Sequence, residues 1–356
     1  MLQTLKEFKI MIRTAVVGAT GYSGVELLRL LHSHPYVKVC KITSGSQEGR
    51  QMAGVFPHLT SINHQVLTSF SPQQLVGEVD LVFFATPSGV STKYIPEIVD
   101  LGIKCIDLSG DFRLNYPADY LKWYKHTPPE SKYLNRAVYG LTEIFAVDIK
   151  TADIVANPGC YPTASLLGII PAVLAGLIEP GSIIIDGKSG VSGSGRGLSL
   201  NAHFSEVNEN LKAYKIGVHQ HIPEIEQILE KVTKKQSDIT FTTHLIPLTR
   251  GMMCTIYARL NKQVSTEEVV KYYQEYYKDH AFVRVRPAGT LPAVKEVAGS
   301  NYCDIGLVAD QRSGSLIIIS VIDNLVKGAA GQALQNMNLI FGWDQTTGLT
   351  NIPMYP

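Results

Sequence analysis

Short apolar runs alternate with segments of helical periodicity over the first 110 residues. The apolar runs lie at 12–19, 37–44, 80–87 and 103–110. Between them, the segments 24–34 and 91–102 carry apolar residues three and four positions apart, which is typical of helices packed on one face. Strands that alternate with helices pair in parallel and build a doubly wound sheet. We therefore predict an α/β fold with a doubly wound parallel sheet for this part of the chain.

The pattern changes after about residue 157. A strand-like run beginning at Ser182 leads into a glycine/serine loop that ends at Gly197. Two longer strand candidates lie at 238–260 and 313–325, with a helical pattern at 265–280 between them. Long strands joined by long returns predict an antiparallel α+β domain. The last helical pattern, 326–342, fits either domain.

Composition excludes several classes of partner. The chain has 356 residues, enough for two domains with substantial cores, and its formal net charge is only +1. That balance gives no reason to expect nucleic acid or an anionic membrane surface as partner. No apolar run approaches the roughly 18 uncharged residues of a membrane span. We expect a protein that binds neither nucleic acid nor membrane.

The cysteines and the first residues indicate a cytoplasmic protein. Five cysteines, far apart and without a CxxC pair, argue against a disulfide framework or a zinc site and fit a reducing compartment. Residues 1–10 carry three charges and lack the apolar core of a secretory signal. The first strand begins directly after Met11, so Met1 and Met11 are alternative starts.

A glycine-rich turn joins the first strand to the first helix. In "GATGYSG", Gly18, Gly21 and Gly24 follow the spacing GxxGxxG. Such a turn brings main chain close to a pyrophosphate, and the following helix N-terminus offers free N–H groups to the anion. We expect a dinucleotide to bind here.

The end of the second strand favours NADP(H) over NAD. A site for NAD usually places a carboxylate there to hold the ribose 2′-hydroxyl. This strand instead ends with the hydroxyls of Thr43, Ser44 and Ser46, and Arg50 follows. Hydroxyls and a cation suit a 2′-phosphate. Lys41 and Arg50 are the candidate cations, with solvated surface charges as the alternative.

One cysteine stands apart from the other four. In "NPGCYPT", Cys160 lies where an apolar strand ends and a long apolar helix begins, whereas the other cysteines lie in or beside strand-like runs. A helix N-terminus favours the thiolate and lowers the pKa of a thiol, and its N–H groups can stabilise an oxyanion. We expect Cys160 to be a nucleophile, with Asn157 beside it as a polar donor or as a residue that orients the thiol.

A histidine pair is the candidate for proton transfer. "GVHQHIPEIEQ" places His219 and His221 just before a helix whose first turn carries Glu224. We expect His219 to be the acid–base residue, with His221 as the alternative. No further ligands lie nearby, so no metal site is expected. His32, His34 and His126 are read as surface positions.

A thiol nucleophile in a dinucleotide-binding protein points to one chemistry. The thiolate attacks an activated acyl group or an aldehyde, and a hydride is then exchanged between the nicotinamide and that carbon.

The motifs, in their order, carry a resemblance. They are "GATGYSG", "ATPSG", "DLSGDFR", "NPGCYPT", "GKSGVSGSGR", "HQHIPEIEQ", "PLTRGM" and "DNLVKGAAGQALQNMN". Over nearly the whole chain they resemble the N-acetyl-gamma-glutamyl-phosphate reductase family, within the aspartate-semialdehyde dehydrogenase superfamily. The resemblance implies NADPH-dependent reduction of an acyl phosphate to a semialdehyde through a cysteinyl thioester, in arginine biosynthesis. It also implies a Rossmann domain of residues 1–156 plus 327–356 and an inserted catalytic and dimerisation domain of residues 157–326.

The resemblance also assigns cofactor contacts. Thr20, Gly21, Tyr22 and Ser23 would line the pyrophosphate, and Ser44 would lie near the 2′-phosphate. Pro87 and Ser88 would lie near the ribose. Gly190, Ser192 and Gly193 would form part of the nicotinamide wall, with Asn324 near the carboxamide.

An anionic substrate needs cations. Four positively charged side chains lie in the family motifs, and we expect them to bind the carboxylate or phosphate of the substrate. They are Arg113, Lys188, Arg196 and Arg250, and structural ion pairs are the alternative for each. His221, Glu224 and Asn157 complete the predicted substrate site.

Three other functions stay open beside this one. Aspartate-semialdehyde dehydrogenase performs the same chemistry on a shorter acyl phosphate, but its cysteine and histidine motifs differ. A carrier-protein-linked reductase would need a basic face that the near-neutral charge does not indicate. A non-catalytic NADP-binding sensor would be free to lose Cys160 and His219, which are both present. The family implies a homodimer or a homotetramer.

Overall fold

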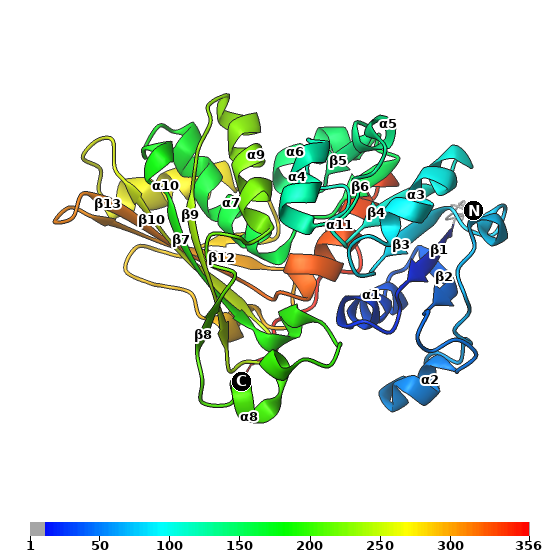
Figure 1. Ribbon diagram of the computed structural model, residues 1–356. Helices are drawn as coiled ribbons and strands as arrows, with labels where there is room; N and C mark the ends of the chain where they lie inside the picture. Colours follow the sequence, from blue (N-terminus) through cyan, green and yellow to red (C-terminus); the bar gives the residue numbers. More distant parts are fainter. Residues whose placement is uncertain (1–10, 356) are drawn as a thin grey trace, which may run out of the picture.

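The structure is a computed structural model that describes residues 11–355, and it contains two β-sheets side by side (Figure 1). Residues 1–10, with the alternative start at Met1, lie outside the described residues. No helix in the described part of the chain is long and apolar enough to cross a membrane.

The first sheet is the predicted parallel sheet. Its strands are β1 (Ile12–Val17), β2 (Val37–Thr43), β3 (Leu81–Phe84), β4 (Lys104–Asp107), β5 (Ala137–Tyr139) and β6 (Ile154–Ala156). They lie in the order β2-β1-β3-β4-β6-β5, and every pair is parallel. The short strand β5, at the edge of the sheet, was not predicted.

Helices cover both faces of this sheet, which confirms the doubly wound fold. The helices are α1 (Tyr22–His32), α3 (Ser91–Asp100), α6 (Thr142–Ile149) and α11 (Gly331–Ile340). Alternate strand residues point to opposite faces, so Val16 and Phe83 pack in one apolar core while Ala15 and Phe84 pack in the other. The helix α11 contacts α1, α6 and β4. The last helix thus packs on the first sheet, although the domain limits stay a prediction.

The second sheet has seven strands and is mixed, so the prediction of an antiparallel sheet is wrong in part. The strands are β7 (Ile184–Gly190), β8 (Lys212–Tyr214), β9 (Thr240–Ile246), β10 (Met252–Arg259), β11 (Val283–Val285), β12 (Cys303–Asp310) and β13 (Ser315–Ile322). Their order is β11-β12-β13-β10-β7-β9-β8. The pairs β7–β9 and β11–β12 are parallel, and the others are antiparallel.

The segment 238–260 is two strands, not one. It turns between Ile246 and Met252, where Gly251 has a φ of +106° that favours glycine. Both halves then hydrogen-bond to β7, which lies between them. The long strand β12 was missed, because "CDIGLVAD" mixes glycine and two acids into its apolar run.

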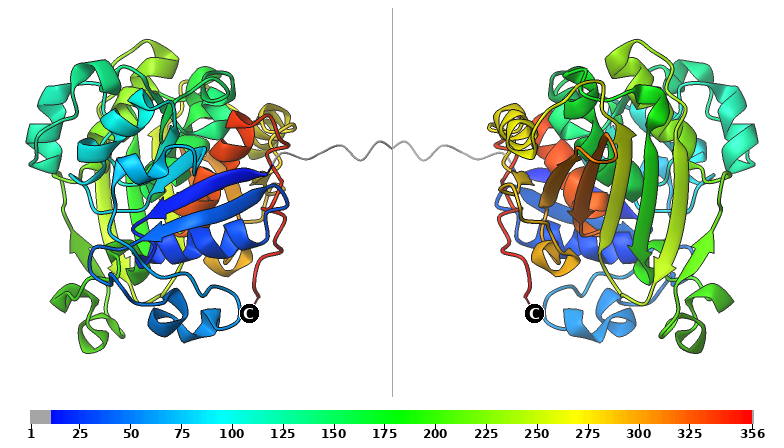
Figure 2. Two further views of the ribbon diagram at one scale, coloured as in Figure 1. Left: turned by 90° about the vertical axis from the view of Figure 1, so that its right-hand side faces the viewer. Right: turned by 90° about the vertical axis from the view of Figure 1, so that its left-hand side faces the viewer.

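One face of the second sheet is covered by helices and the other is open. The covering helices are α7 (Cys160–Leu174), α9 (His221–Thr233) and α10 (Thr266–Tyr276). The helix α7 lies directly on the sheet, where a Cβ on Gly168 would stand 3.1 Å from Ile256 Cδ1. In the right-hand view of Figure 2 the strands lie in front and no helix crosses them.

Shorter segments complete the described chain. The short α-helices are α2 (Met52–Val55), α4 (Pro117–Asp119), α5 (Ser131–Leu134) and α8 (Phe204–Val207). The 3-10 turns are Pro57–Leu59, Pro72–Leu75, Pro180–Ser182, Val191–Ser194, Leu200–Ala202 and Val294–Val297. Two single π-helical turns lie at Tyr120–Tyr124 and Val326–Ala330.

Candidate active site

Cys160 is the first residue of α7, as the sequence indicates. The strand β6 ends at Ala156, and Gly159 caps the helix with an extended ψ of 157°. The side chain of Cys160 is partly buried, whereas Cys105, Cys254 and Cys303 are fully buried. A thiol at this junction adjoins the free N–H groups of a helix start.

A buried ion pair holds the turn in front of Cys160. Glu224 Oε1 accepts hydrogen bonds from the N–H of Gly159 and from the hydroxyl of Tyr139, each at 2.8 Å. Its Oε2 lies 3.3 Å from Nη1 of Arg113, and the two side chains are 0% and 6% exposed. Arg113 also donates to the carbonyl oxygens of Asn157 and Leu108. Both charged groups predicted to bind substrate are therefore engaged with the protein.

Asn157 is likewise engaged, with the last part of the chain. Its Nδ2 donates to the carbonyl of Ala329 at 3.1 Å, and its Oδ1 accepts from Asn336 Nδ2 at 3.1 Å. The side chain is fully buried. It links the turn before Cys160 to the segment that packs against the first sheet.

Burial overturns the expected effect of the helix terminus on the thiol. Desolvation raises the pKa of Cys160 to about 11, although the N–H of Tyr161 and the charge of Arg113 act to lower it. The prediction that the helix N-terminus gives Cys160 a low pKa is therefore wrong for the protein without ligand. A partly enclosed thiol loses more hydration than the helix end restores.

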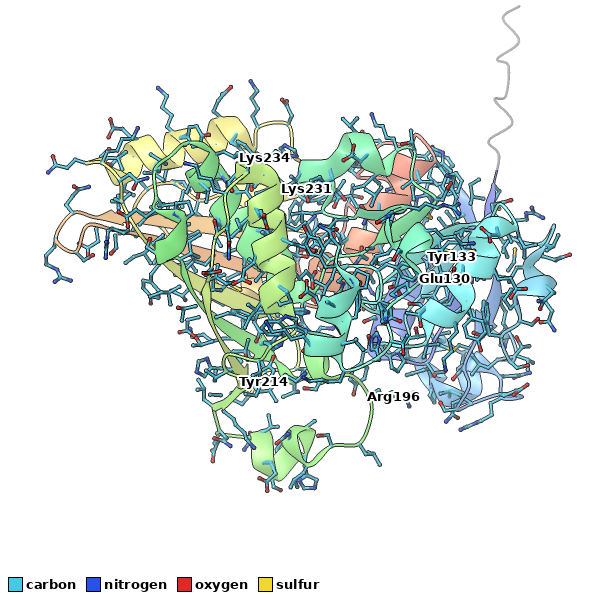
Figure 3. All side chains as sticks on the ribbon, turned by 45° about the horizontal axis from the view of Figure 1, so that its top comes forward. Glu130, Tyr133, Arg196, Tyr214, Lys231 and Lys234 are labelled. Atoms are coloured by element: carbon cyan, nitrogen blue, oxygen red, sulfur yellow. The ribbon has the colours of Figure 1, made fainter. Side chains whose placement is uncertain are left out.

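The two histidines lie together beside this turn. Their side chains are buried, their ring centroids are 4.6 Å apart, and Nδ1 of His219 accepts the N–H of His221 at 3.1 Å. The ring of His219 contacts Tyr161, Tyr214 and Phe241. Tyr214 is labelled in Figure 3.

His221 lies closer to the cysteine turn, and both rings are neutral. A Cβ on Gly159 would stand 2.5 Å from Nε2 of His221. Burial lowers the pKa of His219 to about 3 and also lowers the pKa of His221, which feels the neighbouring His219 and Arg113. Because Nδ1 of His219 accepts a main-chain hydrogen bond, its neutral ring carries the proton on Nε2.

The glycine turn has the close contacts that its sequence predicts. Gly18 has a φ of +85°, and a Cβ there would stand 2.4 Å from the carbonyl oxygen of Ala85. A Cβ on Gly24 would stand 2.3 Å from the carbonyl oxygen of Gly18. The helix α1 begins at Tyr22, next to Ser23, and has no acidic residue in its first turn. An anion at this helix end meets no like charge.

Two hydroxyl groups mark the adjoining end of β2. Thr20 Oγ1 and Ser44 Oγ are buried and 2.7 Å apart. The buried hydroxyl of Thr86, beside Gly18, has no hydrogen-bond partner among the described residues. An unsatisfied buried hydroxyl at this turn fits a site that a polar ligand completes.

The loop after β3, with Pro87 and Ser88, is tied to a carboxylate that the sequence analysis missed. Ser88 Oγ donates to Asp111 Oδ1 at 2.5 Å and lies 2.8 Å from His126 Nε2. Asp111 is fully buried and also accepts from the N–H of Gly89. His126 is therefore not the surface position that we expected, because it is partly enclosed by this network. The motif "DLSGDFR" could have indicated this carboxylate, because its second acidic residue, Asp111, follows the end of β4.

His34 is a second histidine misread as a surface residue. It is 5% exposed, and its Nε2 lies 3.0 Å from Asn338 Oδ1. The partner comes from α11, more than 300 residues away, so the local sequence gave no signal.

The residues predicted to form the nicotinamide wall lie close to one another. Asn324 Nδ2 donates to Ser192 Oγ at 2.9 Å, and its Oδ1 accepts the N–H of Gly251. A Cβ on Gly193 would stand 3.7 Å from Asn324 Nδ2, and one on Gly190 would stand 2.8 Å from the carbonyl oxygen of Leu248. Residues 190–193 and Asn324 thus lie side by side.

Two of the predicted substrate-binding cations have structural partners elsewhere. Arg250 pairs with Glu26 of α1 and, at 3.2 Å, with Asp323 Oδ2. Lys188 pairs with Asp186 at 2.5 Å. Its neighbour Gly187 faces Tyr161 of α7, so Lys188 points to the opposite, open face of the sheet. The structure does not bring Lys188 to Cys160.

Arg196 lies at the glycine turn instead of at Cys160. Its Nη1 donates to the carbonyl oxygen of Thr20 at 3.3 Å. This cation therefore approaches the predicted cofactor site, not the predicted substrate site.

A π-helical turn completes the surroundings of Cys160 and was not predicted. Gly328, within Val326–Ala330, packs so closely that a Cβ there would stand 2.7 Å from Cys160 Cβ. Lys327 beside it is fully buried and pairs with Glu143 at 2.6 Å. The run of small residues in "KGAAG" was the sequence signal for this close packing.

Comparisons with known proteins agree with this geometry. Residues 13–152 match the semialdehyde dehydrogenase NAD binding domain, and residues 160–324 match the semialdehyde dehydrogenase dimerisation domain. An N-acetyl-gamma-glutamyl-phosphate reductase of Geobacillus sp. (strain WCH70) is 55% identical over 96% of this chain and 99% of its own. That of Geobacillus kaustophilus (strain HTA426) is 54% identical over 97% of this chain and 100% of its own.

More distant solved structures share the fold. Aspartate semialdehyde dehydrogenase II from Vibrio cholerae has a TM-score of 0.69 at 17% identity, over 93% of this chain and 99% of its own. The Candida albicans enzyme, solved with NADP, has a TM-score of 0.68 at 14% identity, over 93% of this chain and 98% of its own. With the full-length relatives above, these matches place the sequence: the chain belongs to the N-acetyl-gamma-glutamyl-phosphate reductase family of semialdehyde dehydrogenases.

Proposed function

We propose that the chain reduces N-acetyl-gamma-glutamyl phosphate with NADPH, giving N-acetyl-L-glutamate 5-semialdehyde and phosphate, as a cytoplasmic step of arginine biosynthesis. The observation that carries the proposal is Cys160 at the start of α7, beside His219 and His221, in a chain 55% identical over 96% of its length to a reductase of that name. The free cysteines fit a reducing compartment.

Cys160 is the proposed nucleophile. Its sulfur attacks the acyl carbon, the carbon–oxygen bond to phosphate breaks, and a thioester forms on the cysteine. The N–H groups at the start of α7 then face the oxygen that gains negative charge. Arg113 and Glu224 hold the turn from behind, so we propose a positioning role for this pair.

His219 is the proposed acid–base residue, and His221 is the alternative. NADPH, when bound, supplies the hydride that reduces the thioester carbon. The N–H at Nε2 of His219 would hydrogen-bond to the substrate oxygen while that oxygen carries negative charge. The carbon–oxygen double bond then re-forms as the carbon–sulfur bond breaks, which releases the aldehyde and the thiolate of Cys160. His221, whose Nε2 faces the turn before Cys160, is the proposed acceptor of the thiol proton.

The glycine turn is the proposed cofactor site. Main-chain N–H groups at Thr20, Tyr22 and Ser23, around the start of α1, would face the pyrophosphate. The paired hydroxyls of Thr20 and Ser44, with no carboxylate at the end of β2, favour NADP(H) over NAD. Ser88, Ser192 and Asn324 are the proposed contacts of the ribose and nicotinamide.

The matched dimerisation domain makes the protein a homo-oligomer, and we propose a homodimer or homotetramer that pairs through the open face of the second sheet. Tyr257 and Ile184 stand opposite each other on that face and are 39% and 44% exposed. Apolar side chains on a face without helices suit a second copy of the chain.

The decisive assay runs in the reverse direction. N-acetyl-glutamate semialdehyde, NADP and phosphate are supplied. NADPH formation is followed by absorbance at 340 nm, where the reduced nicotinamide absorbs and the oxidised form does not. We expect phosphate-dependent NADPH formation that Cys160→Ser abolishes, because the alcohol is a far weaker nucleophile than the thiolate. Cys40→Ser is the matched control, since Cys40 lies in β2, and should keep full activity.

Two results contradict the proposal. Turnover of aspartate semialdehyde in preference to the acetylated substrate moves the assignment to the sister enzyme. NADP binding without turnover of either substrate favours the non-catalytic sensor.

A further inference from the structure

Arg196 crosses from the inserted domain to the glycine turn of the first domain. It lies in the exposed loop between β7 and α8 and is labelled in Figure 3. Its Nη1 donates to the carbonyl oxygen of Thr20 at 3.3 Å. Its guanidinium carbon lies 4.4 Å from the centroid of the Phe56 ring, which follows α2. Two contacts with separate segments of the first domain define where this side chain lies.

Those contacts place the guanidinium at the adenosine end of the predicted cofactor site. The side chain of Thr20 is paired with Ser44, directly after β2. In a Rossmann fold the ribose of the adenosine lies at the end of the second strand, and a cation there accommodates a 2′-phosphate.

The cations of the first domain near β2 are less suited to this task. Lys41 hydrogen-bonds to the carbonyl of Gln74. Arg50 donates to Gln47 Oε1 at 2.7 Å and to the carbonyl of Gly54 at 3.3 Å. Arg196, in contrast, uses only Nη1, and its Nε and Nη2 make no hydrogen bond to the described residues. A guanidinium edge with free donors binds phosphate well, and stacking on an aromatic ring orients it.

We propose that Arg196 binds the 2′-phosphate of the cofactor, so that preference for NADP(H) is set by a residue of the inserted domain. The inference depends on the proposed cofactor, NADP(H), and does not depend on the proposed substrate. It replaces the predicted role of Arg196 at the substrate with a role in cofactor specificity.

Two nucleotides that differ only in the 2′-phosphate test the proposal without any turnover. Adenosine 2′,5′-bisphosphate and adenosine 5′-monophosphate are titrated calorimetrically into the full chain. For Arg196→Ala we expect the bisphosphate to bind about tenfold to hundredfold more weakly, the range for hydrogen bonds to a charged group. Binding of the monophosphate should change less than about twofold. Arg196→Lys should recover part of the loss, because it keeps the charge without the fork.

Arg50→Ala tests the rival cation, an exposed arginine after β2, and should weaken neither nucleotide by more than about twofold. Equal weakening of both nucleotides by Arg196→Ala would mean that Arg196 only ties the two domains together, and would overturn the proposal. So would a selective loss in Arg50→Ala with none in Arg196→Ala. A wild-type protein that binds both nucleotides equally would overturn the NADP preference itself and this inference with it, while the reverse assay would still decide the substrate.

Discussion

At Cys160 two opposing influences on one thiol can be compared. A helix N-terminus stabilises a negative charge by about 0.3–2 kcal/mol. The rise of the pKa from 9.0 to about 11 corresponds to about 3 kcal/mol in favour of the neutral thiol. Burial is therefore the larger effect, and it favours the neutral thiol in the protein without ligand. Activation of this thiol then depends on what the substrate and the neighbouring histidines add.

The buried histidines make stability depend on pH, and His219 can be tested alone. Its pKa is lowered from 6.5 to about 3, so the unfolded chain takes up a proton as the pH falls through 6.5 while the folded chain does not. Stability is therefore lost on acidification below pH 6.5. Between pH 7 and pH 5 we expect His219 to account for about 2 kcal/mol of that loss.

Urea unfolding of His219→Gln at pH 7 and pH 5 measures this contribution. The difference between the two pH values should be smaller in the variant than in the wild type by about that amount. Replacing the exposed His64 by Gln serves as the control and should leave the difference unchanged. Parallel losses in the wild type and His219→Gln would show that His219 is not held neutral.

At the scale of elements, the π-helical turn Val326–Ala330 packs directly behind Cys160, the proposed nucleophile. Gly328 contacts Cys160, and Ala329 accepts a hydrogen bond from Asn157. The buried pair of Lys327 and Glu143 anchors the turn. Single π turns are frequent at functional sites, where an extra residue in the turn redirects a side chain. This turn sets how closely the last helix approaches the thiol.

Gly328→Ala tests that closeness. The new Cβ would stand 2.7 Å from Cys160 Cβ, so the turn or the cysteine must move. We expect the free energy of unfolding to fall by about 1–3 kcal/mol, which is typical of overpacking. We also expect kcat to fall at least tenfold, because a displaced Cys160 needs to raise the activation free energy by only about 1.4 kcal/mol for that effect. NADP binding should persist, because the atoms nearest the added Cβ belong to Cys160 and Ile322 and not to the glycine turn.

Gly181→Ala is the control for that change. No atom lies within 4 Å of the Cβ it would add, and its φ is not in the left-handed region. It should leave stability and kcat unchanged. An equally active Gly328→Ala protein would mean that the π turn does not position Cys160.

At the scale of the whole molecule, contacts between the domains and the open sheet face matter most. Arg250 joins Glu26 of α1 to Asp323, and Arg196 reaches Thr20. Glu26 also pairs with Arg29, and these charges lower its pKa against the effect of burial. The two sheets are thus held together by charged contacts as well as by the last helix.

The open face predicts how copies of the chain associate. Replacing both Ile184 and Tyr257 by Lys puts two charges on each side of an interface that pairs like with like. We expect the assembly to dissociate, measured as a halving of the molar mass by light scattering after gel filtration. Val147→Lys, on α6 and 81% exposed, is the control and should not change the mass. A double variant that keeps the wild-type mass would place the interface on another surface.

Local pattern was sufficient for much of this protein. The alternation of strands and helices, the turn at Gly18–Gly24 and the helix start at Cys160 were all predictable, because each depends on residues within one or two turns of the chain. The parallel sheet followed from that alternation. The histidine pair was found for the same reason, as both rings lie in one short segment.

Tertiary structure alone decided the rest. The partners of Arg250 and Lys188, the burial of His34, the contact of Gly328 with Cys160 and the approach of Arg196 to Thr20 all join segments far apart in sequence. The parallel pairing of β7 with β9 likewise depends on the insertion of β7 between β9 and β10. The high pKa of Cys160 is a sum of desolvation over all these neighbours. The sequence by itself determined which helix, strand or turn carries each candidate residue. Long-range packing decided the partners and the protonation of these residues, because burial and pairing depend on segments that lie far apart in the sequence.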